Sequence, residues 1–212
     1  MRSKKNGRRR LGPIAGILVL SVGLSACEKE APPIGQEAQD RVVQLAEPVV
    51  DELLRTLVTN LTQAMQDGGP VNAIEFCSLE ALPLTHSVES GSPGGLELKR
   101  TSFRYRNPLN APDEAEEMAL LYFEEATLSG DPVPPSYVQR VSDEEFRYYR
   151  PLFLGEACLN CHGARDGLLP EVQAALDAKY PEDLATGYGP GDFRGVVRVS
   201  VPASSLEAEA GG

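Results

Sequence analysis

The five residues from Cys158 to His162 read Cys-x-x-Cys-His, and their types and spacing predict covalent attachment of a haem. Two thiols three positions apart can lie on one short helical turn and add to the two vinyl groups of a haem, while the imidazole of His162 reaches the iron. A bare Cys-x-x-Cys would also fit zinc binding or thiol exchange. A zinc site of this kind needs a second pair of ligands, and a histidine directly after Cys161 fits neither alternative well.

The N-terminal segment predicts export and lipid attachment. Residues 2–10 include six Lys or Arg, an apolar run follows up to Leu24, and the segment closes with Leu24-Ser25-Ala26-Cys27. This is the pattern of a lipoprotein signal peptide over residues 1–26, after which Cys27 would carry the lipid. The apolar run is short for a membrane-spanning helix, so an uncleaved anchor is the less favoured alternative.

Two unrelated stretches of sequence thus predict the same location, because covalent haem attachment takes place outside the bacterial cytoplasm. Glu28, directly after Cys27, favours the outer membrane over the inner membrane. We expect a protein that is anchored by lipid on the periplasmic side of the cell envelope.

The charge of the chain is strongly acidic. The 212 residues carry a net charge of −11, and removal of residues 1–26 leaves 14 basic against 31 acidic side chains, a net charge of −17. Such a surface repels nucleic acid and would steer the protein toward a basic redox or signalling partner, although acidity also serves solubility alone. Residues 27–35 are expected to form a tether, 36–205 one domain, and 206–212 a disordered tail. No second folded domain or attached output module is expected.

The apolar pattern predicts an α+β domain. Helical spacing indicates a long helix over 36–67 with a bend at Pro48, ended by Gly68-Gly69, and a second helix from Pro70 that stops before Pro83 and carries Cys77 on its apolar face. Further helices are expected at 112–128 and 170–179, and strands at 96–106, 137–141, 146–154 and 195–201. Helices that flank an antiparallel sheet give this fold class. The loop 180–192, with its turn glycines, is expected to cover an edge of the haem.

Several separated motifs resemble a known family. They are Ala73-Ile74 with Cys77, Lys99 to Ser102, Arg106 to Pro112, Cys158 to Gly163, Tyr180-Pro181 with Asp183, Gly187-Tyr188, Gly191-Asp192 and Arg194-Gly195. Together they resemble the single-haem, PAS-like c-type haem domain typified by a cyanobacterial Tll-type protein, over residues 40–203. The resemblance implies a PAS-like antiparallel sheet that holds one covalent haem c, with His162 and Cys77 as the axial iron ligands. It also implies a role in redox or gas sensing.

The cysteine count agrees with a special role for Cys77. Cys27 is assigned to the lipid, and Cys158 and Cys161 to the haem, which leaves Cys77 without a disulfide partner in an oxidising compartment. From the residues alone, Cys77 could equally be a small buried apolar side chain. His86 competes for the sixth coordination position, but it follows Pro83 in an expected surface loop.

Other polar and sulfur-containing residues have weaker assignments. Arg100, Arg104 and Arg106, with Asn107, are candidates for binding the two haem propionates by charge-assisted hydrogen bonds. The alternative is an exposed basic strand face. Met65 and Met118 lie on apolar helical stripes and are expected to pack rather than to bind iron.

A thiolate ligand would determine much of the chemistry, since an anionic soft donor stabilises ferric iron and lowers the reduction potential. Loss of that ligand on reduction would open a position for carbon monoxide or nitric oxide. We therefore expect a lipid-anchored monohaem protein that senses redox state or a diatomic gas. The alternative is a low-potential periplasmic electron carrier. An enzyme is not expected, because a haem with two protein ligands has no open coordination site and no general base is evident nearby.

Overall fold

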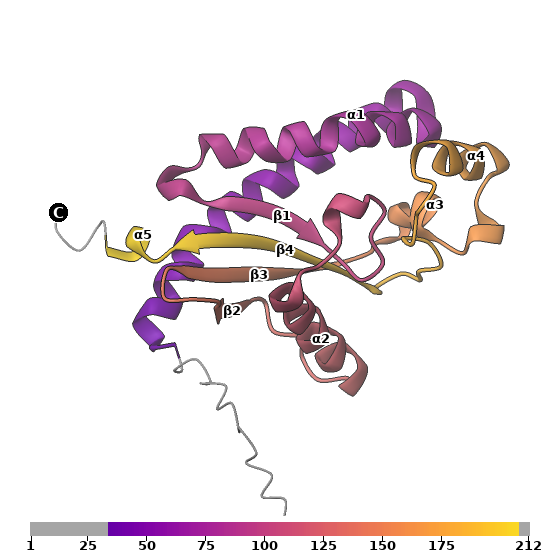
Figure 1. Cartoon of the computed structure of the whole chain (residues 1–212). Coiled ribbons are helices and arrows are strands. Elements are labelled where there is room, and N and C mark those ends of the chain that lie inside the picture. Colours follow the sequence, from indigo (N-terminus) through magenta and orange to yellow (C-terminus); the bar gives the residue numbers. More distant parts are fainter. Residues whose placement is uncertain (1–33, 208–212) are drawn as a thin grey trace, which may run out of the picture. The chain divides into compact units, whose positions relative to one another are not determined.

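The structure is a computed structural model that describes residues 34–207, in which a four-stranded sheet lies between helices (Figure 1). The predicted signal peptide, Cys27, residues 28–33 of the tether and residues 208–212 of the tail lie outside the described residues. Within 34–207, no helix has the length and apolar character needed to cross a bilayer.

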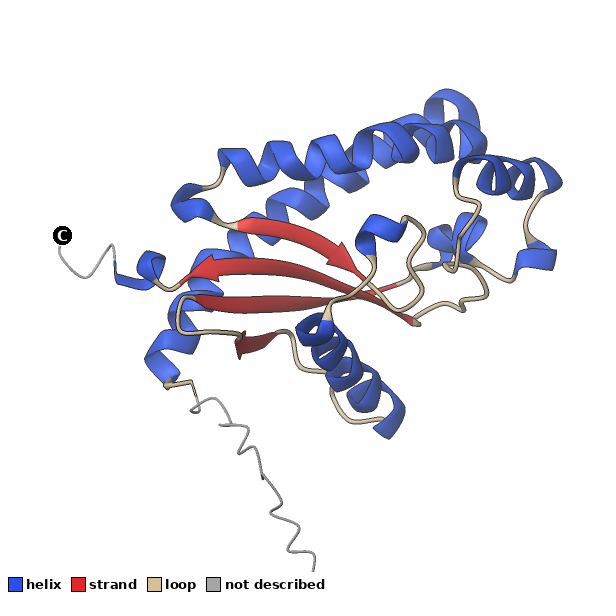
Figure 2. Cartoon of the chain, viewed as in Figure 1, coloured by secondary structure: helices blue, strands red, loops and turns tan. Residues whose placement is uncertain are grey.

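The helices are α1 (Gln36–Gly91), α2 (Glu114–Ser129), α3 (Leu159–His162), α4 (Pro170–Lys179) and α5 (Ser204–Glu207). The strands are β1 (Glu97–Thr101), β2 (Tyr137–Arg140), β3 (Glu145–Phe153) and β4 (Phe193–Pro202). These four strands form one antiparallel sheet in the order β1-β4-β3-β2, so the last strand of the chain lies inside the sheet (Figure 2). The α+β class and the antiparallel sheet predicted from the sequence are confirmed.

The two faces of the sheet pack against different helices, because successive side chains of a strand point to opposite faces. Val197, Val199 and Val201 of β4 pack against the first half of α1, in a cluster that includes Val42, Ala46, Val49, Val50 and Leu53. Val196, on the opposite face, packs with Ala119, Leu120 and Phe123 of α2. The sheet is therefore enclosed between α1 and α2.

Helix α1 consists of two limbs joined at Gly68 and Gly69. Both residues leave the helical region, with φ of −158° and +71°, and the second value is the left-handed region that glycine tolerates. The predicted break at this pair is confirmed. The predicted stop before Pro83 is wrong, because the helix keeps helical dihedral angles through this proline; the helix also continues through Pro48, where a bend was predicted as possible.

Exposure explains why these prolines are tolerated. A proline within a helix cannot donate a hydrogen bond to the carbonyl four residues earlier. The residues in question, Gln44 for Pro48 and Leu79 for Pro83, are both exposed, so their carbonyls can bind water instead. The second limb consequently runs on to Gly91, and His86 lies on a helix rather than in the expected loop.

Strand β1 is shorter than predicted and ends at Thr101. Its pairing with β4 ends where Thr101 faces Val196, next to Gly195. A Cβ at Gly195 would lie 2.3 Å from the Thr101 carbonyl oxygen, so only glycine permits this close approach. Residues 102–106 then leave the sheet and become available to a loop.

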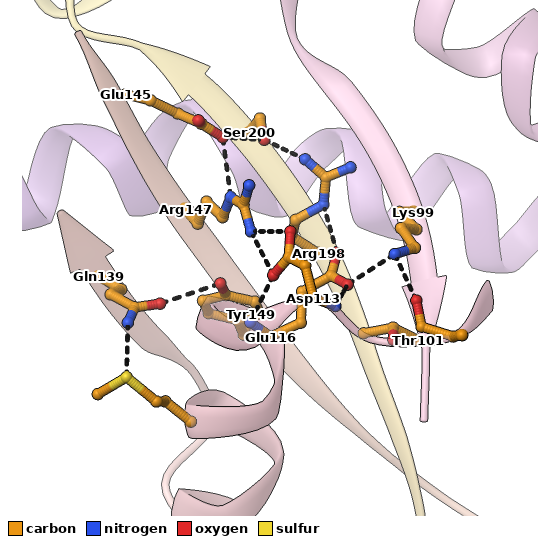
Figure 3. Close-up of polar contacts among 12 residues, drawn as sticks. Lys99, Thr101, Asp113, Glu116, Gln139, Glu145, Arg147, Tyr149, Arg198 and Ser200 are labelled. Atoms are coloured by element: carbon orange, nitrogen blue, oxygen red, sulfur yellow. Dashed lines mark hydrogen bonds and ion pairs between the residues drawn. The ribbon is translucent and has the colours of Figure 1, made fainter. Parts of the chain in front are cut away.

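A polar network fixes the N-terminal end of α2 to the sheet (Figure 3). The carboxylate of Glu116 is 1% exposed, accepts a hydrogen bond of 2.6 Å from Lys99 Nζ and lies 3.1 Å from Arg198 Nε. Glu116 also forms a capping box with Asp113, and Arg147 binds the Asp113 carboxylate at 2.7 Å. One buried carboxylate therefore links α2 to β1 and β4.

We expect Glu116→Gln to lower the free energy of unfolding by about 3 kcal/mol, because Lys99 and Arg198 would keep their partly buried charges without an anion. Urea unfolding of the purified protein measures this change. The exposed neighbour gives a matched control, Glu117→Gln, for which we expect a change below about 0.5 kcal/mol. Equal effects of the two variants would contradict a stabilising role for the network.

Candidate haem-binding site

The Cys-x-x-Cys-His segment forms the predicted helical turn. Cys158 ends a 3₁₀ turn that begins at Glu156, and α3 continues directly through Cys161 and His162. Both cysteines are free thiols and partly exposed. Their side chains are thus available on one short turn, as two thioether bonds to a single group would require.

His162 is oriented by a backbone carbonyl. Its Nδ1 lies 2.7 Å from the carbonyl oxygen of Ala185. A carbonyl can only accept, so Nδ1 carries the proton and Nε2 keeps its lone pair. Burial, with the nearby charges of Arg106 and Arg194, lowers the pKa of His162 to about 3. The imidazole is therefore neutral and presents one nitrogen as a metal ligand.

The loop 180–192 is bound to this turn by its backbone. Gly187 donates to the Gly163 carbonyl at 2.7 Å, and Tyr188 donates to the His162 carbonyl at 3.0 Å. The Tyr188 ring meets the His162 ring edge-on, with centroids 6.3 Å apart, and Arg104 lies 3.8 Å above the Tyr188 ring. The loop thus covers His162 on the side of Tyr188.

Arg106 connects the same two segments through its guanidinium. Nε donates to Asp183 at 3.1 Å, and Nη2 donates to the carbonyls of Cys161 at 2.6 Å and Ala185 at 3.2 Å. The Asp183 carboxylate is only 2% exposed. Arg106 therefore holds the haem motif against the loop that orients His162.

His162 and Cys77 line one cavity of about 330 Å³, although they come from distant parts of the sequence. Its walls are largely apolar and come from both limbs of α1, the ends of β1 and β3, and the start of β4; they include Leu54, Leu57, Val58, Leu61, Phe76, Ala81, Leu82, Leu152, Leu154 and Val196. Arg100, Arg106 and Arg194 are the basic residues on the wall. An apolar space with a few convergent polar groups is the usual form of a cofactor site.

The family model described as Tll0287-like matches residues 35–202. The chain belongs to the Tll0287-like family. No curated protein sequence matches the chain. Among solved structures, the crystal structure of the cyanobacterial haem protein Tll0287 has 23% sequence identity and a TM-score of 0.55, covering 80% of this chain and 98% of that one. This likeness shows a shared fold.

Not every predicted residue of this Tll0287-like domain reaches the cavity. Arg100, Arg106 and Asn107 line it, and the Asn107 side chain also accepts a hydrogen bond from the backbone N–H of Leu109. Arg104 lies outside the cavity, in a separate groove with Tyr188.

The competing ligand candidates also lie elsewhere. The His86 side chain is 70% exposed, is not on the cavity wall, and has Glu89 as its neighbour at 3.8 Å. Met65 is partly buried and is likewise not on the wall. The expectation that Met118 packs in the interior is wrong, since it is 57% exposed on α2.

Sequence reasoning missed three parts of the site. Arg194 lines the cavity and donates to the Arg104 carbonyl at 2.9 Å, while Asp183 and the Ala185 carbonyl fix Arg106 and His162. Asp183 and Arg194 fall within the motifs that resemble the family, and this position was the sequence signal that could have identified them as site residues. A backbone carbonyl such as that of Ala185 has no side-chain signature.

We expect Arg106→Gln to loosen the loop 180–192, because it leaves the buried Asp183 carboxylate without its cation. The free energy of unfolding should fall by about 3 kcal/mol, and the amides of Gly187 and Tyr188 should exchange hydrogen faster. The control is Arg165→Gln, which breaks a pair with Asp177 of which both members are substantially exposed; its effect should stay below about 1 kcal/mol. Unchanged amide exchange in Arg106→Gln would show that the loop is held by other contacts.

Proposed function

We propose that this protein binds one haem c through thioether bonds from Cys158 and Cys161, with His162 and Cys77 as axial iron ligands. The observation that carries the proposal is the placement of a preoriented neutral His162 and of Cys77 on the wall of one apolar cavity. Membership of the Tll0287-like family and a structural neighbour that is a haem protein support it.

The residues present fit a haem in several independent ways. Two free thiols lie on the turn that ends in His162, and exposed apolar side chains such as Val58 and Leu61 line the cavity, where a flat apolar group would cover them. Arginines on the wall offer charge to propionates. The four-stranded antiparallel sheet with helices on both faces supports a PAS-like classification of the domain.

When bound, the haem supplies one-electron redox chemistry. An anionic sulfur donor from Cys77 favours ferric iron and a low reduction potential. Burial raises the pKa of the Cys77 thiol, against the opposing charges of Arg100 and Arg106. The buried sulfur is therefore stable as a neutral thiol whenever it binds no metal.

Because the Cys77 thiol is stable without a metal, it can detach from the iron on reduction. This favours sensing of redox state or of a diatomic gas as the physiological role. Cys77 lies on the second limb of α1, eight residues after the non-helical Gly69. Detachment of a ligand on reduction slows electron exchange, so retention of both ligands in both oxidation states would instead favour the alternative role of a low-potential electron carrier. We propose no enzymatic activity.

We further propose that the mature protein begins at a lipid-modified Cys27 and is held at the periplasmic side of the cell envelope. The support is the sequence pattern of residues 1–27 together with the oxidising compartment in which haem c is attached. Mass spectrometry of the mature N-terminus tests this proposal. A lipidated peptide beginning at Cys27 is expected, and a mature chain that starts elsewhere would contradict it.

Covalent haem attachment is tested by intact mass after acid–organic extraction. We expect the mass of one haem to stay with the polypeptide, since thioether bonds outlast the loss of the axial ligands. Replacement of both Cys158 and Cys161 by Ala should release all of it. Haem that stays covalently bound to this double variant would refute the proposed attachment.

The sixth ligand is tested by Cys77→Ser, with His86→Ala as the control. We expect ferric protein to show a low-spin, thiolate-type spectrum that Cys77→Ser abolishes, with a rise in reduction potential because an anionic donor is lost. His86→Ala should leave the spectrum unchanged, because His86 lies away from the cavity. Loss of low-spin character in the His86 variant alone would point to two histidine ligands instead.

A further inference from the structure

The arginines around the cavity differ in whether another group of the protein already interacts with their guanidinium. Arg106 is paired with Asp183, Arg104 stacks on Tyr188, and Arg194 donates to a backbone carbonyl. The Arg100 side chain makes no hydrogen bond or ion pair with any residue in 34–207. It is nevertheless partly buried and lines the cavity. A desolvated guanidinium without an anion is costly, so this charge calls for a partner that the polypeptide's carboxylates do not supply.

The sheet register determines which way Arg100 points. Successive residues of β1 alternate between the two faces, and Leu98 packs in the core beneath α1 while Lys99 reaches Glu116 on the α2 face. Arg100 therefore lies on the α1 face, below the limb that carries Cys77. Its presence with Cys77 on one cavity wall agrees with this orientation.

The composition of the cavity wall identifies the group nearest to hand that can become an anion. Among the described residues that line the cavity there is no Asp or Glu, and Cys77 supplies the thiol. Arg106 lines the same wall, but its charge is already compensated by Asp183.

We propose that Arg100 is the positioning residue for the Cys77 ligand: its guanidinium contacts the sulfur and balances the negative charge of the thiolate, rather than binding a haem propionate. This inference rests on the proposed His162 and Cys77 ligation. A charge-assisted hydrogen bond to an anionic acceptor is worth more than a neutral one. Loss of Arg100 should therefore weaken the hold of Cys77 on the iron without affecting the covalent attachment through Cys158 and Cys161.

Competition with added imidazole measures that hold. Imidazole must displace Cys77 to bind ferric iron, so its apparent Kd falls when the sulfur is held less tightly. We expect Arg100→Gln to lower the apparent Kd about tenfold, and Arg100→Lys, which keeps the charge but loses the planar fork, to give an intermediate value. Arg140→Gln removes the same charge on β2, away from the cavity wall, and should stay within about twofold of the wild type.

A wild-type imidazole Kd in Arg100→Gln, with the thiolate spectrum intact, would overturn the inference and return Arg100 to the propionates. If Arg100→Gln fails to fold, Arg100→Lys decides alone, and a wild-type Kd there has the same meaning. Failure of the proposed function is recognised separately, because wild-type protein would then lack the covalent haem mass or the thiolate spectrum; the inference would fall with it.

Discussion

The carbonyl oxygen of Ala185 accepts hydrogen bonds from both His162 Nδ1 and Arg106 Nη2, and the rest of the site depends on this shared acceptor. It fixes the tautomer of His162, so that the free nitrogen is the one that faces away from the loop. Arg106 in turn binds the Cys161 carbonyl and the buried Asp183 carboxylate. The turn from Cys158 to His162 thereby acquires a defined orientation.

The fold brings Cys77 to the same cavity as His162 by a separate route. The first limb of α1 packs along the sheet, the chain reverses at Gly68 and Gly69, and the returning limb places Cys77 over the end of β1. The β4 strand lies between β1 and β3, and it approaches β1 closely at Gly195, next to the last residue pair of the two strands and on the cavity wall. The buried network around Glu116 holds the opposite face of the sheet to α2. Both faces of the sheet are thus packed, and the cavity lies at one end of the sheet, at the ends of β1 and β3 and the start of β4.

The sequence predicted the elements whose signal is local. Alternation of apolar residues indicated the inner strands β3 and β4 to within two residues at each end, Gly68-Gly69 indicated the reversal of α1, and the spacing of Cys158, Cys161 and His162 indicated the turn. It failed where the outcome depends on distant contacts. Pro83 does not end its helix, because the carbonyl that it leaves without a partner is at an exposed position, and exposure is a property of the folded chain.

The site shows the same division. The sequence identified most side chains of the site by residue type and by resemblance to the family. It did not predict which groups surround each of them. Three arginines close together in sequence have three different surroundings: Arg106 joins two backbone segments, Arg104 covers Tyr188, and Arg100 faces the cavity without a carboxylate. Nothing in their residue type separates them, because only the register of β1 and the path of the loop after it decide where each guanidinium lies.

We propose that the folded chain brings His162 and Cys77 to one iron atom. X-ray absorption at the iron edge of the purified ferric protein tests it most directly, because sulfur and nitrogen scatter differently in the first coordination shell. We expect one sulfur and five nitrogen neighbours, with the sulfur absent in Cys77→Ser. A first shell of nitrogen alone in the unaltered protein would contradict it.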